Sequence, residues 1–210
     1  MDPAASTFVT TEHFVLQTSR AATISETTGR ASIFLGAVSA GLVAIAFAGQ
    51  TSRTALYTFG LVLFPVLTFL GYTTFRRTLQ TSIDDTIYLQ RINRLRRFYL
   101  DTVPELGDYI SGAVPDDDIP ALLRSEGYRG GRWQIMLSVP GTVAILTSVL
   151  LGVTVGFAGA ALTGNNLWVA TIAGIVVFLV AAVLFQRFER AERPRAHAAW
   201  AAELERQARA

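Results

Sequence analysis

The stretch ASIFLGAVSAGLVAIAFAG, Ala31–Gly49, decides the fold class of this chain. It contains no acidic residue, no histidine and no arginine, and three further runs share this character: Ala55–Phe75, Ile135–Ala158 and Leu167–Phe185. An α-helix rises about 1.5 Å per residue, so about 20 apolar residues cross a hydrocarbon core of about 30 Å. We therefore predict an all-α integral membrane protein with four transmembrane helices, arranged as two hairpins with cytoplasmic helical extensions.

The distribution of apolar residues, more than their number, separates this protein from a soluble one. Apolar residues make up 51% of the chain, a share that an apolar soluble protein can also reach. A soluble core helix carries a polar stripe, however, and Gly152–Ala158 and Ile172–Phe185 show almost none. The absence of cysteine excludes disulfides, thiolate nucleophiles and Cys-based metal sites.

The arginines predict an orientation in the membrane. Of the 18 basic residues, all arginine, 17 lie in residues 1–30, 76–134 and 186–210, and Arg53 alone lies in a short connection between apolar runs. Positive residues concentrate on the cytoplasmic side, so both termini and the central segment are expected there. A secretory signal peptide is the competing interpretation of the first run, but the 30 residues before it are too long for an n-region.

These observations divide the chain into five segments. They are an N-terminal cytoplasmic or interfacial helix (1–30), a first transmembrane hairpin (31–75), a cytoplasmic helical segment (76–134), a second transmembrane hairpin (135–185) and a cytoplasmic C-terminal helix (186–210). Thr11 is the expected N-cap of the first helix, which should continue into the first span. Pro194 is expected to interrupt the last helix.

An apolar stripe at helical period runs along the central segment. Its members are Tyr88, Ile92, Leu95, Tyr99, Val103, Leu106 and Ile110. The second span should continue through Arg76 and Arg77 into this helix, and Pro104 should end it near 102–103. The stripe can pack on the N-terminal helix of the same chain or on another subunit, and we favour the same chain.

One basic cluster lies on this predicted helix. It consists of Arg91, Arg94, Arg96 and Arg97. Contact with anionic lipid headgroups accounts for such a cluster. A site for a phosphate-bearing ligand is the alternative, because the guanidinium group matches phosphate oxygens in a two-pronged geometry. Nucleic-acid binding would require a clustered basic face with aromatic or groove-fitting elements, and beyond this short cluster we see none.

No metal site or cofactor is expected. Asp116, Asp117 and Asp118 do not have the alternating spacing of a calcium-binding loop, and Asp118 as the cap of a short helix explains them. His13 and His197 have no neighbouring ligands at metal spacing, so both are expected at the surface.

Small residues at intervals of four predict close helix contacts. Ser148, Gly152, Gly156 and Ala160 form such a ladder in the third span, and Gly36 and Ala40, with Ala37 and Gly41, form a shorter one in the first. Small residues let helix backbones approach each other in lipid. The contact is either within one four-helix bundle or between subunits of a homo-oligomer, and we favour the first.

The residue types in the four spans also limit the reactions that the protein could catalyse. They hold no acidic residue or histidine that could relay protons, and no base beside a serine that could activate it. We therefore expect a protein without enzymatic activity.

The passage ISETTGRASIFLGAVSAGLVA, Ile24–Ala44, resembles the entry to the first span in Pycsar-effector-type membrane proteins of bacteria and the related SLATT group. Glu26, Arg30, Leu35 and Gly36 stand at the matching positions, and RINRLRR after the second span is similar as well. The resemblance covers about the first 100 residues; the second hairpin departs from it. It implies a role in conflict systems that damage the membrane when a nucleotide signal arrives.

Two functions follow as expectations. The first is a multi-pass protein of the bacterial inner membrane that acts as a membrane effector or signalling module, whose cytoplasmic layer senses a ligand or partner. The alternative is a small channel or transporter subunit, with a hydroxyl-lined path among Thr142, Thr147 and Ser148.

Overall fold

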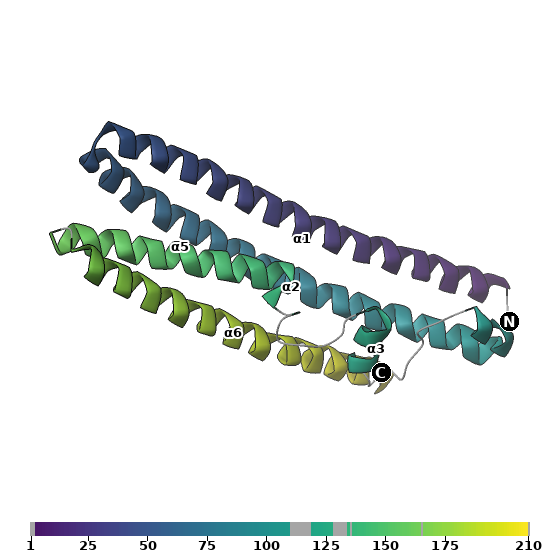
Figure 1. Cartoon of the computed structure of the whole chain (residues 1–210). Coiled ribbons are helices and arrows are strands. Elements are labelled where there is room, and N and C mark those ends of the chain that lie inside the picture. The colour runs from purple at the N-terminus through teal and green to yellow at the C-terminus, as the bar shows by residue number, and fades with distance from the viewer. Residues whose placement is uncertain (1–2, 110–118, 128–133, 135, 165, 210) are drawn as a thin grey trace. The chain divides into compact units, whose positions relative to one another are not determined.

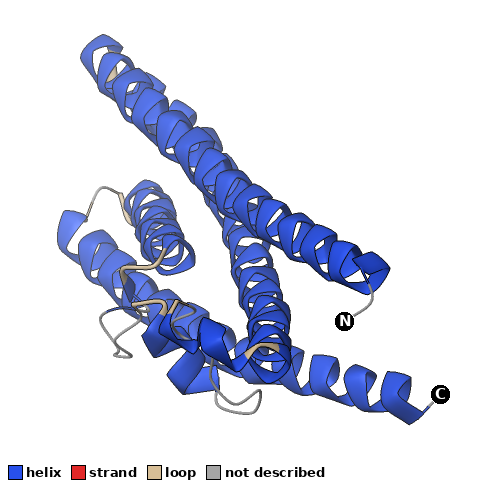
Figure 2. Cartoon of the chain, turned by 90° about the vertical axis from the view of Figure 1, so that its right-hand side faces the viewer, coloured by secondary structure: helices blue, strands red, loops and turns tan. Residues whose placement is uncertain are grey.

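The computed structural model describes residues 3–109, 119–127, 134, 136–164 and 166–209. The described residues form five α-helices and one 3-10 helix, which are α1 (Pro3–Thr51), α2 (Arg53–Thr102), η1 (Pro104–Asp108), α3 (Ile119–Ser125), α5 (Val139–Leu162) and α6 (Leu167–Arg209) (Figure 1). Helices and loops account for every residue that is described, with no strand among them (Figure 2).

Two helices are far longer than a span. Helix α1 has 49 residues and α2 has 50, so the predicted continuations of the first and second spans into polar sequence are confirmed. Helix α2 ends at Thr102 because Val103 precedes Pro104 and takes a non-helical ψ of 85°. This end also matches the prediction.

Three predicted helix boundaries were wrong. Helix α1 begins at Pro3, and the Thr11 hydroxyl donates to the Thr7 carbonyl inside the helix instead of capping it. Helix α5 begins four residues after the start of its apolar run, because the Ser138 side chain accepts a hydrogen bond from the Gly141 N–H and so caps the helix.

The third wrong boundary is at Pro194, where helix α6 continues without interruption. A proline ring removes one backbone N–H, so the carbonyl of Arg190, four residues earlier, loses its helical partner. Both residues are exposed, and water can hydrate the released carbonyl.

The chain folds into two compact units. The polar unit consists of Met1–Glu26, Gln80–Ile135 and Ala196–Ala210, and the apolar unit consists of Thr27–Leu79 and Met136–Arg195. Helices α1 and α2 therefore contribute residues to both units. The apolar unit contains the apolar parts of α1, α2, α5 and α6, and these four helices are long and apolar enough to cross a membrane.

Within the apolar unit, α2 contacts each of the other three helices. The α1 side chain of Phe34 is fully buried against Gly71 of α2. The rings of Phe64 in α2 and Phe157 in α5 lie 5.0 Å apart between centroids. On α6, Phe185 makes an edge-to-face contact with Phe75 of α2 at 4.7 Å.

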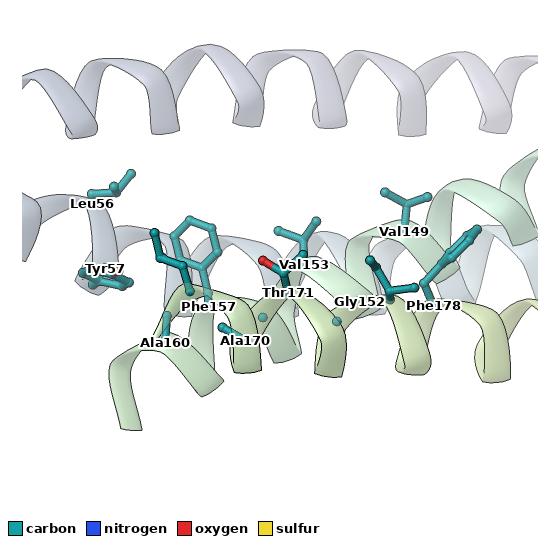
Figure 3. Close-up of a pocket in the computed structure, with 14 residues that line it drawn as sticks. Leu56, Tyr57, Val149, Gly152, Val153, Phe157, Ala160, Ala170, Thr171 and Phe178 are labelled. Atoms are coloured by element: carbon teal, nitrogen blue, oxygen red, sulfur yellow. The ribbon is translucent and has the colours of Figure 1, made fainter. Parts of the chain in front are cut away.

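Helices α5 and α6 approach each other so closely that their backbones touch. A Cβ atom on Gly152 would lie 2.6 Å from the Gly174 carbonyl oxygen, and one on Gly156 would lie 3.5 Å from the Ala170 carbonyl oxygen. Ala160 continues this contact face, as Figure 3 shows beside Ala170. Part of the small-residue ladder in α5 thus packs on α6 of the same chain, and Ser148 is fully buried.

The shorter ladder in α1 does not pack in this way. Gly36 and Ala40 are exposed, and a Cβ atom on Gly36 would have no neighbour within 4 Å. Gly41, a member of the same predicted set, does pack on α2, because a Cβ there would lie 2.8 Å from Leu67. The expected contact within the bundle was therefore wrong at Gly36 and Ala40 but not at Gly41.

The backbone contact predicts that replacement of glycine by alanine costs far more stability at Gly152 than at Gly36. Gly152→Ala should destabilise the apolar unit by about 1–3 kcal/mol, because its methyl group has no space beside the Gly174 carbonyl. Gly36→Ala is the matched control and should be neutral or slightly stabilising. Thermal unfolding of the detergent-solubilised protein measures both; equal midpoints for the two variants would contradict the packing described here.

Candidate functional site

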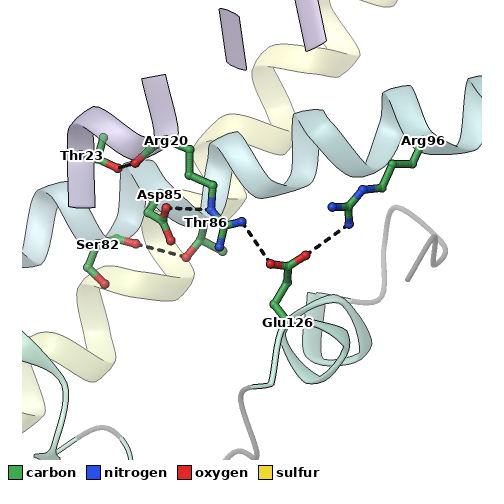
Figure 4. Close-up of polar contacts among 7 residues, drawn as sticks. All are labelled: Arg20, Thr23, Ser82, Asp85, Thr86, Arg96 and Glu126. Atoms are coloured by element: carbon green, nitrogen blue, oxygen red, sulfur yellow. Dashed lines mark hydrogen bonds and ion pairs between the residues drawn. The ribbon is translucent and has the colours of Figure 1, made fainter. Parts of the chain in front are cut away.

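Four charged side chains meet in the polar unit. We call Arg20, Asp85, Arg96 and Glu126 the Arg20 cluster (Figure 4). Arg20 Nε donates to Asp85 Oδ1 at 3.0 Å, and Arg20 Nη1 donates to Glu126 Oε2 at 3.1 Å. Arg96 Nη1 donates to the other oxygen of Glu126 at 3.2 Å. The cluster thus joins α1, α2 and the end of α3.

Helical spacing explains the two contributions from α2. Asp85 and Arg96 are eleven residues apart, which is close to three full turns, so both lie on one face of the helix. Leu89 and Ile92 stand between them on that face and are almost completely buried. The predicted apolar stripe contains Ile92, as this buried face does. It also contains Tyr88, whereas the buried residue at this turn of the helix is Leu89.

The end of α3 positions the Glu126 carboxylate. Leu122 anchors the helix with 2% of its surface exposed, and the Glu126 N–H donates to its carbonyl. Gly127 follows with φ of +88° and donates to the Arg124 carbonyl. A glycine in the left-handed region is a common way to end a helix.

The contacts in the cluster favour the charged forms of its members. Burial opposes ionisation of Glu126, but hydrogen bonds and charge from Arg20 and Arg96 outweigh it and lower the pKa of the carboxyl. Burial likewise opposes the charge of Arg20, and Asp85 and Glu126 outweigh it and raise the pKa of the guanidinium group. The ionised Glu126 therefore stabilises the fold above pH 4.5, its ordinary pKa, and this stabilisation is lost as pH falls through the lowered pKa.

The four arginines of the predicted basic cluster have different environments in the structure. Arg96 belongs to the Arg20 cluster, Arg97 is half-buried, and Arg91 and Arg94 are exposed. Arg20 was missed as a site residue, because its partner Asp85 is 65 residues away and no local pattern links them.

Buried polar groups accompany the cluster in the polar unit. Gln90 and Asn93 of α2 are buried, and Gln90 Oε1 has no hydrogen-bond partner among the described residues. The His13 ring lies 6.1 Å from that of Tyr99, and burial, with a smaller effect of the Arg96 charge, lowers its pKa. His13 and His197, both expected at the surface, are half-buried.

The apolar unit contains one buried carboxylate that sequence analysis missed. Glu189 of α6 has 1% of its surface exposed, and both Nη2 and Nε of Arg193 donate to its Oε1, at 2.8 and 3.3 Å. The pairing with Arg193, one turn along the same helix, explains how the charge is accommodated.

The hydroxyls of the expected polar path bond within their own helix. Thr147 donates to the Val143 carbonyl at 2.7 Å and Ser148 to the Ala144 carbonyl at 2.8 Å, and both residues are buried. Thr142 is exposed. The three residues therefore do not share one environment.

Among the described residues, no group of three or more His, Asp or Glu side chains could hold a metal ion. The predicted cap at Asp116–Asp118 and the stripe residue Ile110 lie outside the described residues. Comparisons with protein-family models, with curated proteins and with solved structures each found no match. The resemblance of the first span to conflict-system proteins and the lack of enzymatic activity stay predictions.

The geometry predicts that Glu126 holds the end of α3. Glu126→Gln should weaken this attachment by about 1–3 kcal/mol, because two partly buried guanidinium groups lose their charged acceptor. Hydrogen exchange at the amides of residues 126 and 127 measures the loss. The wild-type protein should lose the same protection on acidification below pH 4.5, and the variant should not.

A matched control is available in the half-buried Glu192, which pairs with the exposed Arg195 at 3.8 Å. Glu192→Gln should change stability by less than about 0.5 kcal/mol. If Glu126→Gln protects the two amides as well as the wild type does, the Arg20 cluster does not hold α3.

Proposed function

We propose that this chain is a four-span protein of the bacterial inner membrane. The outward faces of the four apolar helices support this proposal: Ile33, Phe69 and Trp168 expose 70%, 69% and 81% of their surfaces. In water, apolar surface of this extent would drive aggregation, whereas hydrocarbon solvates it without cost. Apart from the helix ends and the carbonyls four residues before Pro65 and Pro194, an α-helix also pairs its backbone groups within itself, as a lipid-exposed segment must.

The proposed orientation has the polar unit and both termini in the cytoplasm. All members of the Arg20 cluster belong to that unit, as do the exposed Arg91 and Arg94. The connections at the other ends of the helices are short and carry Arg53 alone. This asymmetry is the one that the positive-inside rule describes.

The proposed role is that of a membrane effector or signalling module without enzymatic activity. The observation that carries it is the continuity of α1 and α2, which supply the Arg20 cluster and also two of the apolar helices. A ligand or partner that separates Glu126 from Arg20 and Arg96 would change the restraint on those helices. The intact cluster represents the resting state in this proposal.

The absence of native cysteines gives a clean test of the orientation. In intact cells, a membrane-impermeant maleimide should label Ser52→Cys, between α1 and α2, and should leave Ser125→Cys, at the end of α3, unlabelled until the cells are opened. The opposite pattern would place the polar unit outside the cell. If neither site is labelled in opened cells, neither side chain is accessible to the reagent.

The effector role predicts a change of membrane potential. Expression in a bacterial host should depolarise the cells, and Glu126→Gln should do so more strongly at an equal amount of membrane protein, because it releases the resting state. A potential-sensitive dye reports the result, with Glu192→Gln expected to equal the wild type. Fully polarised cells at high expression of both the wild type and Glu126→Gln would contradict this role.

A further inference from the structure

A pair of exposed arginines follows the apolar part of α6. Arg187 and Arg190 come directly after the fourth apolar run, which ends at Phe185, and both side chains are exposed. Residues three apart on an α-helix are neighbours on one face. The pair therefore presents two guanidinium groups next to each other on the surface of the apolar unit.

No carboxylate of the described residues neutralises this pair. The positions three and four residues from each of the two arginines, where a helical ion pair forms, hold no acidic residue. The nearby acids of α6 have other partners, because Glu189 pairs with Arg193 at 2.8 Å and Glu192 pairs with Arg195 at 3.8 Å. Like charges one turn apart on a helix repel each other, so an external anion at this place relieves the repulsion.

The same face of α6 carries apolar side chains up to the pair. Its members, all exposed and at intervals of four, three, four and three residues, are Val176, Val180, Val183, Arg187 and Arg190. This order, apolar and then basic, corresponds to the change from hydrocarbon to headgroups at the edge of a bilayer. In the proposed orientation, the pair lies at the depth of the phosphate groups of the cytoplasmic leaflet.

A third arginine adds positive charge at this level of the apolar unit. Arg76 of α2 is exposed, and its guanidinium carbon lies 4.7 Å from the centre of the Phe188 ring. An aromatic face attracts a guanidinium group but does not cancel its charge. Because Phe188 is the neighbour of Arg187 in α6, the charge of Arg76 adds to the positive potential near the pair.

These observations favour an anionic phospholipid over a soluble anion. A guanidinium group matches phosphate oxygens in a two-pronged geometry, and anionic lipids of the cytoplasmic leaflet attract basic residues next to a span. A soluble anion makes no use of the apolar stripe beside the pair, whereas the hydrocarbon chains of a phospholipid contact it. We propose that Arg187 and Arg190 bind the phosphate of one anionic phospholipid, an inference that rests on the proposed membrane insertion.

Native mass spectrometry of the full chain tests the proposal. The protein is extracted in mild detergent and titrated with phosphatidylglycerol or with phosphatidylcholine, and the fraction of protein with one bound lipid is counted. We expect tighter binding of phosphatidylglycerol, because the choline group cancels the phosphate charge of the other lipid. Arg187→Gln combined with Arg190→Gln should lower the affinity for phosphatidylglycerol about tenfold, the equivalent of about 1.4 kcal/mol, and leave that for phosphatidylcholine unchanged.

A matched control removes the same two charges elsewhere. Arg91 and Arg94 of α2 are also exposed and three residues apart, but they begin sixteen residues after Phe75, where the second apolar run ends. Arg91→Gln combined with Arg94→Gln should therefore bind phosphatidylglycerol as tightly as the wild type does. All four substituted side chains are exposed, so thermal unfolding should show an intact fold in both double variants. An equal loss of affinity in the two would reveal attraction by net charge alone and overturn the site.

Three other outcomes would overturn the proposal. Equal affinity of the wild type and the double variant at 187 and 190 would remove the pair from lipid binding. Displacement of phosphatidylglycerol by an equal concentration of inorganic phosphate would identify a soluble anion as the occupant. A dimer that the wild type forms and this double variant loses would place an acidic residue of a second copy at the pair.

A separate measurement tests the membrane insertion on which the proposal rests. The wild type, reconstituted in phosphatidylcholine vesicles, should float with them on a density gradient after an alkaline wash. Removal of the protein by the wash would contradict insertion, and the lipid site with it. Protein that floats with the vesicles but shows no preference for phosphatidylglycerol would leave insertion intact and overturn the lipid site alone.

Discussion

The contact between the backbones of α5 and α6 is the interaction on which the apolar unit depends. Gly152 and Gly174 allow an approach so close that a methyl group on either residue would overlap the carbonyl group of the other. Dispersion forces and not the hydrophobic effect hold helices together in an apolar medium, so every tenth of an ångström at this contact matters.

The polar unit is held by a different kind of interaction. Its core along α2 combines the buried side chains of Leu89 and Ile92 with buried Gln90 and Asn93 and the charges of the Arg20 cluster. Buried or partly buried charge pairs contribute little net stability compared with apolar packing, but removal of one partner is costly because the other stays buried.

Local patterns in the sequence were sufficient for some of these elements. The four apolar runs, the continuation of α2 past Arg76 and its end before Pro104 follow from properties of neighbouring residues, and the structure has each of them. Pro194 shows the limit of local rules, because an exposed carbonyl can be hydrated and the helix then continues. The position of Gly36 shows another, since small residues at the right spacing indicate a possible contact face but not which rotation of the helix is used.

The helical class, the lengths of the apolar segments and the concentration of arginine outside them can be read from the sequence, because hydropathy and charge are properties of single residues averaged over a window. The fold was needed to show that Arg20 joins Asp85 and Glu126, that Glu189 is buried and that Gly152 touches Gly174. These contacts join residues on different helices or depend on which face of a helix is covered. These contacts depend on how whole helices pack, because a contact contributes free energy only when both of its surfaces are in place.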